Sequence, residues 1–265
     1  MRHIMRGFNR YVRGAGKWSA IAFAGAAAAY GTYVGVTWYR YGNVGPPAAE
    51  DEDPLLDRFL PAYEIVERHQ IRVAASAAVT FDAARDVDLQ GSAVVRTIIR
   101  AREIILGAKP GDRRSPRGLL AETQSLGWGV LAEVPGREVV VGAVTRPWEA
   151  NVTFRALPPA QFAAFKEPGY VKIAWTIRAD PIAGSESVFR TETRAIATDP
   201  QARSKFRRYW SFLSPGIIII RWALIGPVKK EAERRAREAR WKRTNDARCG
   251  TQQVVPAVAS SLIHR

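Results

Sequence analysis

The chain has 265 residues, of which 47% are hydrophobic, and a formal net charge of +15. Its single cysteine, Cys249, excludes an intrachain disulfide, and three scattered histidines exclude a zinc site of the usual ligand spacing. The positive charge lies at the ends: the first 17 residues hold five Lys/Arg and no acid, and Arg203–Arg243 holds thirteen against three Glu. Because a nucleic-acid groove would place its cations on the folded middle, we expect no nucleic-acid partner.

An uncharged segment near the N-terminus predicts a membrane anchor. Trp18–Tyr39 is 22 residues long, enough for a helix to span the hydrocarbon core. A basic tail, residues 1–17, precedes it, and aromatic residues near both of its ends suit a membrane–water interface. We predict a single-pass transmembrane helix over residues 18–41, with the N-terminus cytoplasmic and the rest on the far side of a bacterial inner membrane. A cleaved signal peptide and a buried soluble helix are the alternatives.

The next residues, 42–54, form an acidic linker rich in proline and glycine, after which we expect one domain over residues 55–243. Alternation predicts a first strand over 64–74. Helical periodicity then predicts two helices, one over 79–87 and one over 92–106, followed by a long basic loop.

Beyond this loop the period of the hydrophobic pattern changes to two. Pro135 and Gly136 provide a turn between the first two of these strands, and a short helical insertion is expected over 158–165. The pattern predicts strands over 126–134, 139–145, 148–157, 171–177 and 187–198.

A long helix completes the domain. Asp199 and Pro200 are typical of a helix start, and Phe206, Trp210 and their neighbours form one apolar face. Because proline removes a backbone donor, we expect a kink or break at Pro215. A charged helix should follow to about residue 243, and residues 244–265 should form a disordered tail. A second membrane span over Tyr209–Val228 is an alternative, which Arg221 near its middle makes costly.

An antiparallel sheet closed by one long helix predicts an α+β protein. The stretches LGWGVLAEVPGREVVVGAVTRPWEANVTF, YVKIAWTIRADP and SVFRTETRAIATDPQARSKFRRYWSFLSPGIIIIRW resemble those of the START-like (SRPBCC) superfamily, in an uncharacterised bacterial, membrane-anchored branch. The resemblance implies a helix-grip fold, in which a curved antiparallel sheet wraps around the C-terminal helix. It also implies a cavity between sheet and helix for a hydrophobic molecule.

Large aromatic residues are the candidate lining of that cavity, although they could equally fill a closed core. They are Trp128, Trp148, Phe154, Tyr170, Trp175, Phe189, Phe206, Trp210 and Trp222.

Catalytic chemistry is weakly indicated. Arg190, Glu192 and Arg194 share one strand face, which we interpret as a solvent-exposed charge ladder rather than a headgroup site. His69 has no evident partner. The candidate acid/base carboxyl groups are those of Glu122, Glu133 and Glu149.

The sequence therefore favours a membrane-anchored, non-catalytic domain that binds a lipid or another hydrophobic small molecule, without a cofactor or metal. One alternative is a cyclase or dehydratase that uses cavity carboxylates or His69. The other is an interaction module in an envelope complex, with a membrane-complex or homo-oligomeric partner.

Overall fold

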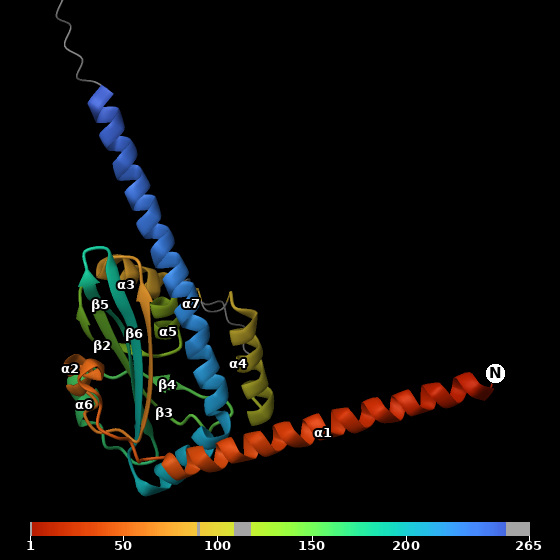
Figure 1. Ribbon diagram of the computed structural model, residues 1–265. Coiled ribbons are helices and arrows are strands. Elements are labelled where there is room, and N and C mark those ends of the chain that lie inside the picture. The colour runs from red at the N-terminus through yellow and green to blue at the C-terminus, as the bar shows by residue number, and fades with distance from the viewer. Residues whose placement is uncertain (1, 89–90, 109–117, 253–265) are drawn as a thin grey trace, which may run out of the picture.

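The computed structural model describes residues 2–88, 91–108 and 118–252, which form one antiparallel sheet with helices on both of its faces (Figure 1). The strands are β1 (Ile65–Val73), β2 (Gly129–Val134), β3 (Glu138–Thr145), β4 (Phe154–Arg155), β5 (Val171–Ala183) and β6 (Glu186–Ala197). The helices are α1 (Arg2–Arg40), the 3-10 turn η1 (Ala49–Asp51), α2 (Pro54–Asp57), α3 (Ala77–Asp86), α4 (Ala93–Leu106), α5 (Leu119–Ser125), α6 (Pro159–Ala164) and α7 (Pro200–Gln252).

The strand order is β1-β6-β5-β3-β2, with β4 paired to β3. All pairings are antiparallel, and the sheet is open, which confirms the α+β class. The strand predicted over residues 148–157 is wrong in extent, because only Phe154 and Arg155 pair with β3.

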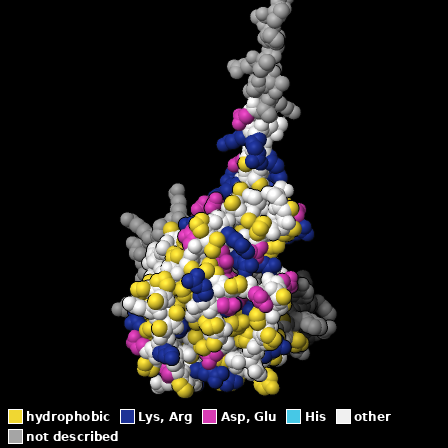
Figure 2. Space-filling view, turned by 90° about the vertical axis from the view of Figure 1, so that its left-hand side faces the viewer, with side chains coloured by type: hydrophobic (Ala, Val, Ile, Leu, Met, Phe, Trp, Pro, Cys, Tyr) yellow, Lys and Arg dark blue, Asp and Glu magenta, His cyan; other side chains and the backbone are white. Residues whose placement is uncertain are grey.

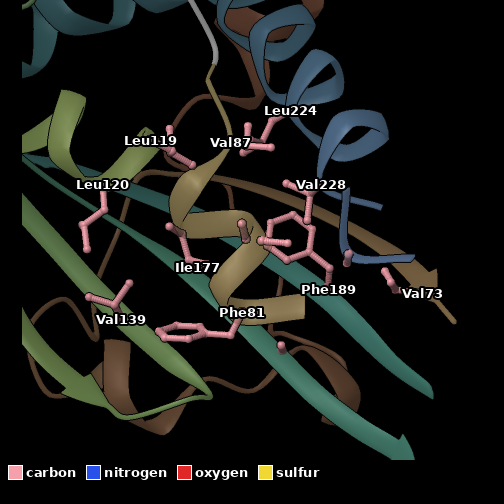
Figure 3. Close-up of a cluster of buried hydrophobic side chains, with 14 of the residues drawn as sticks. Val73, Phe81, Val87, Leu119, Leu120, Val139, Ile177, Phe189, Leu224 and Val228 are labelled. Carbon is pink, nitrogen blue, oxygen red and sulfur yellow. The ribbon is translucent and has the colours of Figure 1, made fainter. Parts of the chain in front are cut away.

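One face of the sheet, the inner face, carries α3 and α7. Figure 3 shows Phe81 of α3 and Leu224 and Val228 of α7 pointing into a common core with Ile177 and Phe189 of the sheet. These side chains are fully buried. Burial of a large apolar side chain contributes about 1.5–3 kcal/mol, so this core fixes α3 and α7 on the sheet.

The opposite, outer face is covered by α2 and α6 through a second apolar cluster that includes Leu56 and Phe162. The charge ladder expected to face solvent also lies on this face, and the expectation is wrong, since Arg194 is only 1% exposed. Its guanidinium donates to Glu192 at 2.6 Å and to the carbonyl of Leu60 at 3.0 Å. Figure 2 looks onto the side that carries α2 and α6, where cations and carboxylates lie among hydrophobic side chains.

Helix α7 runs without a break through Pro215 and Pro227. The predicted break at Pro215 is therefore absent. Phe206 before it and Leu224 after it are both buried in the domain, so packing on each side offsets the hydrogen bond that proline removes. Beyond the sheet, α7 projects away from the domain as far as Gln252, and the rest of the expected tail lies outside the described residues (Figure 1).

Helix α1 projects from the other end of the domain, and its C-terminal half docks on α7 (Figure 1). The hydroxyl of Tyr30 donates to the carbonyl of Phe212 at 2.6 Å, and the Tyr33 hydroxyl lies 2.9 Å from that of Ser214. Arg207 donates to the carbonyl of Trp38 at 2.9 Å. Several aromatic residues that the sequence assigned to a membrane interface therefore also contact the domain.

Candidate functional site

The inner face of the sheet is largely apolar, and one group of polar residues on it lies on β1 and β6. Two neighbouring cross-strand pairs, Glu67 with Thr193 and His69 with Thr191, lie between apolar pairs on either side. Residues that pair directly across strands point to the same face, so these four side chains point toward α7. This polar set therefore lies on an otherwise apolar part of the sheet, at the β1 edge.

Helix α7 adds a cation to this group. The guanidinium of Arg221 lies 4.8 Å from the ring centroid of Trp175, which pairs with Thr193 on the neighbouring strand. The next residue, Trp222, stacks edge-on against His69 with ring centroids 5.4 Å apart. We call Glu67, His69, Thr191, Thr193 and Arg221 the inner polar cluster.

The inner polar cluster holds several buried polar atoms without a partner among the described residues. These atoms are Nε2 of His69 and the hydroxyl oxygens of Thr191 and Thr193. The nearest carboxylate oxygen to His69, from Glu67, is 3.9 Å from Nε2, beyond hydrogen-bond distance. Within the described chain the Arg221 guanidinium makes a ring contact but no ion pair. Buried polar groups are normally hydrogen-bonded, so this cluster is suited to receive a ligand group.

The electrostatics of the cluster favour one retained positive charge. Burial raises the pKa of Glu67, and Arg221 partly offsets that rise. Burial and the charge of Arg221 lower the pKa of His69, which keeps the imidazole neutral near pH 7. Burial also lowers the pKa of Arg221 to about 10, which leaves its guanidinium charged at neutral pH.

A groove leads from the surface to this cluster. It has a volume of about 660 Å³, lies between α1, the edge strand β1 and α7, and includes Glu67 among its lining residues. Tyr33 and Val36 of α1 line one side, and Trp210 and Ile218 of α7 line another. Charged side chains also line the groove: Arg40, Glu64, Glu67 and Arg68. Its volume is within the usual range for small-molecule sites.

The predicted cavity aromatics are distributed over several environments. Trp175 lies under Arg221, and Trp128 packs on Phe154 with ring centroids 4.9 Å apart. Phe189 is fully buried in the core between α3, α7 and the sheet. Trp222 is 64% exposed.

The remaining four predicted aromatics lie near one end of the sheet, where β1 and β5 begin. Phe206 and Trp210 are buried where α1 meets α7, and Trp148 packs against the same cluster. Tyr170 packs against the cluster on the outer face. Of the nine, Trp175 and Trp222 contact members of the inner polar cluster, and Trp210 lines the groove.

The candidate acid/base residues also separate. Glu133 pairs with Arg85 at 2.7 Å and Glu149 with Arg146 at 3.6 Å, in both cases between partly exposed side chains. Glu122 is buried on α5, where burial and a hydrogen bond with Asp88 raise its pKa to about 7. Only His69 belongs to the inner polar cluster.

Sequence reasoning did not find Glu67, Thr191, Thr193 or Arg221 as site residues. The alternation that turned Ile65, Ile71 and Val73 inward applies equally to Glu67 and His69 between them. Arg221, inside the apolar run of α7, was a second signal, because the burial of a charge is costly unless the charge has a partner.

Among the described residues, no group of three or more His, Cys, Asp or Glu side chains is arranged to hold a metal ion. No family model and no curated protein matches the chain.

Solved structures that are similar to this protein include a conserved protein from Geobacillus kaustophilus, with 11% identity and a TM-score of 0.31 over 64% of this chain and 96% of that one. A hypothetical protein from Helicobacter pylori matches with 6% identity and a TM-score of 0.35 over 71% and 99%. An aromatase/cyclase from Streptomyces sp. R1128 matches with 15% identity and a TM-score of 0.22 over 66% and 97%.

Proposed function

We propose that this protein is a membrane-held, non-catalytic domain that binds a lipid or another hydrophobic small molecule between the sheet and α7. The observation that carries this proposal is the inner polar cluster, whose unpartnered polar atoms interrupt a largely apolar face beside a groove with apolar side chains on both helices that line it. Ligand sites are mostly apolar with a few convergent polar groups, and this arrangement has both features.

Helix α1 supports the membrane part of the proposal. Its apolar side chains are unusually exposed, with Ile21 at 62% and Phe23 at 78%. By length and composition, one helix among the described residues could cross a membrane, the Pro200–Asp246 part of α7. Buried core helices pass the same test, and Leu224 and Val228 of α7 lie in the core. We therefore assign the anchor to α1 and not to α7.

The docking of α1 on α7 holds the domain close to the membrane that α1 would span. Between Trp18 and the first docked residue, Tyr30, only about 12 helical residues are free, and they span about 18 Å. The hydrocarbon core is about 30 Å thick, so a span over residues 18–39 brings Phe212 to the membrane surface or below it. Three large apolar side chains at this end of the domain are exposed: Phe212 at 47%, and Ile104 and Ile105 of α4 at 68% and 67%. Their exposure suits a membrane environment.

The groove lined by Tyr33 and Val36 of α1 then opens beside the membrane, from which an apolar ligand can enter directly. Native mass spectrometry of the full chain, released from lipid nanodiscs, tests the proposal. We expect a stoichiometric bound molecule that organic extraction identifies as a lipid or another apolar compound.

Two neighbouring substitutions on α7 locate the ligand. Ile218→Trp fills the groove and should remove the bound molecule. Ile219→Trp places the same ring at a position that is 47% exposed and does not line the groove, so it should leave binding unchanged. Wild-type chain that is empty, or equal occupancy in both variants, would contradict the proposal.

A further inference from the structure

Four of the five residues of the inner polar cluster can donate a hydrogen bond. Arg221 brings a guanidinium with five N–H groups and no acceptor. Each of the two threonine hydroxyls can donate one hydrogen bond, and each lacks a partner among the described residues. His69 Nε2 is likewise unpartnered and donates when the proton sits on that nitrogen. The one carboxylate in the cluster is that of Glu67.

These groups lie on the same part of the inner face. Thr193 is the cross-strand partner of both Glu67 and Trp175, and Arg221 lies over the ring of Trp175. His69 and Thr191 form the next pair along the same two strands. The donors therefore lie on both sides of the interface between the sheet and α7.

We infer that the inner polar cluster binds the oxyanion head of an amphipathic ligand, a carboxylate or a phosphate, whose apolar tail lies in the groove between α1, β1 and α7. This inference rests on the proposed function and adds the chemical class of the ligand. A carboxylate or phosphate offers several acceptor lone pairs and matches the fork of a guanidinium. Burial favours the neutral form of the Glu67 carboxyl, since it raises that pKa, and this reduces repulsion of an incoming anion.

Three probes with the same tail separate the headgroups: laurate carries a carboxylate, dodecyl phosphate a phosphate, and 1-dodecanol a neutral hydroxyl. Their binding to the full chain in phosphatidylcholine nanodiscs is measured by calorimetry, with empty nanodiscs correcting for partition into lipid. We expect at least one of the two anions to bind about tenfold or more tightly than dodecanol, as charge-assisted contacts imply. The stronger anion identifies the carboxylate or the phosphate as the natural head.

Arg221→Gln should abolish that preference while it leaves dodecanol affinity within about twofold, because only the head contacts the guanidinium. Arg240→Gln, an exposed arginine on the same helix, is the matched control and should retain the preference. If Arg221→Gln does not fold, Thr193→Val removes one donor without a charge change and should lower anion affinity about threefold.

Failure of the oxyanion site can be distinguished from failure of the proposed function. Equal affinity of the wild type for all three probes, or an anion preference that survives both Arg221→Gln and Thr193→Val, overturns the oxyanion site but leaves the proposed function standing. Absence of binding for all three contradicts the proposed function itself.

Discussion

Thr193→Val should stabilise the empty protein, although it removes a polar group from the proposed binding site. The hydroxyl of Thr193 is buried and has no partner in the described structure, and its residue is 8% exposed. An unpaired buried hydroxyl costs about 1–3 kcal/mol, so a methyl group in its place should raise the free energy of unfolding by about 1 kcal/mol. For a domain of this size that corresponds to an increase in Tm of about 2–4 °C.

Thr176→Val is the matched control. Thr176 is 1% exposed on the neighbouring strand, but its hydroxyl oxygen accepts a hydrogen bond from the backbone N–H of Glu192 at 3.1 Å. The same chemical change there should lower the free energy of unfolding by about 1 kcal/mol. Both variants are compared by urea unfolding of ligand-free protein in a non-ionic detergent. Equal destabilisation by the two would refute the view that the Thr193 hydroxyl is unsatisfied.

Three further outcomes are expected. Arg194→Met should lower the free energy of unfolding by about 3–5 kcal/mol in urea, because Glu192 and the Leu60 carbonyl lose a buried partner; a loss under about 1 kcal/mol would contradict this. Burial and Asp53 raise the pKa of Glu138 from 4.5 to about 8. The contribution of the protonated Glu138 to the free energy of unfolding is therefore complete below pH 4.5 and is lost as the pH rises to 8. Glu138→Gln should therefore gain stability over the wild type progressively between pH 5 and 8, and a pH-independent difference would count against it. Arg207→Gln removes a hydrogen bond to the Trp38 carbonyl and should speed hydrogen exchange at the end of α1 about tenfold, whereas unchanged exchange would mean that this contact does not hold α1.

Local patterns in the sequence predicted much of the domain. The alternation of β5 and β6 and the helical period of α4 were predicted correctly. Asp199 was predicted to start the last helix, and its carboxylate accepts from the N–H groups of Gln201 and Ala202 at 2.8 and 3.0 Å. Such features depend on residues within one turn or one strand, so the sequence contains them directly.

The shorter helices were harder to predict. Helix α2 has only four residues and lies at the end of a stretch that reads as a linker. Asp53 nonetheless is 3% exposed and accepts from the N–H of Leu56 at 2.9 Å. With so few residues, α2 depends on burial of Leu56 against the outer face, which no local pattern reveals.

The sequence by itself determined the class of the protein, the order of its main strands and helices, and the uncharged segment that predicts an anchor. Only the tertiary structure decided which polar residues meet. Glu67, Thr193 and Arg221 are more than 100 residues apart at the extremes, and they come together because the β1–β6 register pairs the first two and α7 lies over them. The same holds for the charged residues at 190–194. The strand pattern predicts that they share one face, but whether that face is exposed to water or covered by α2 depends on where α2 packs.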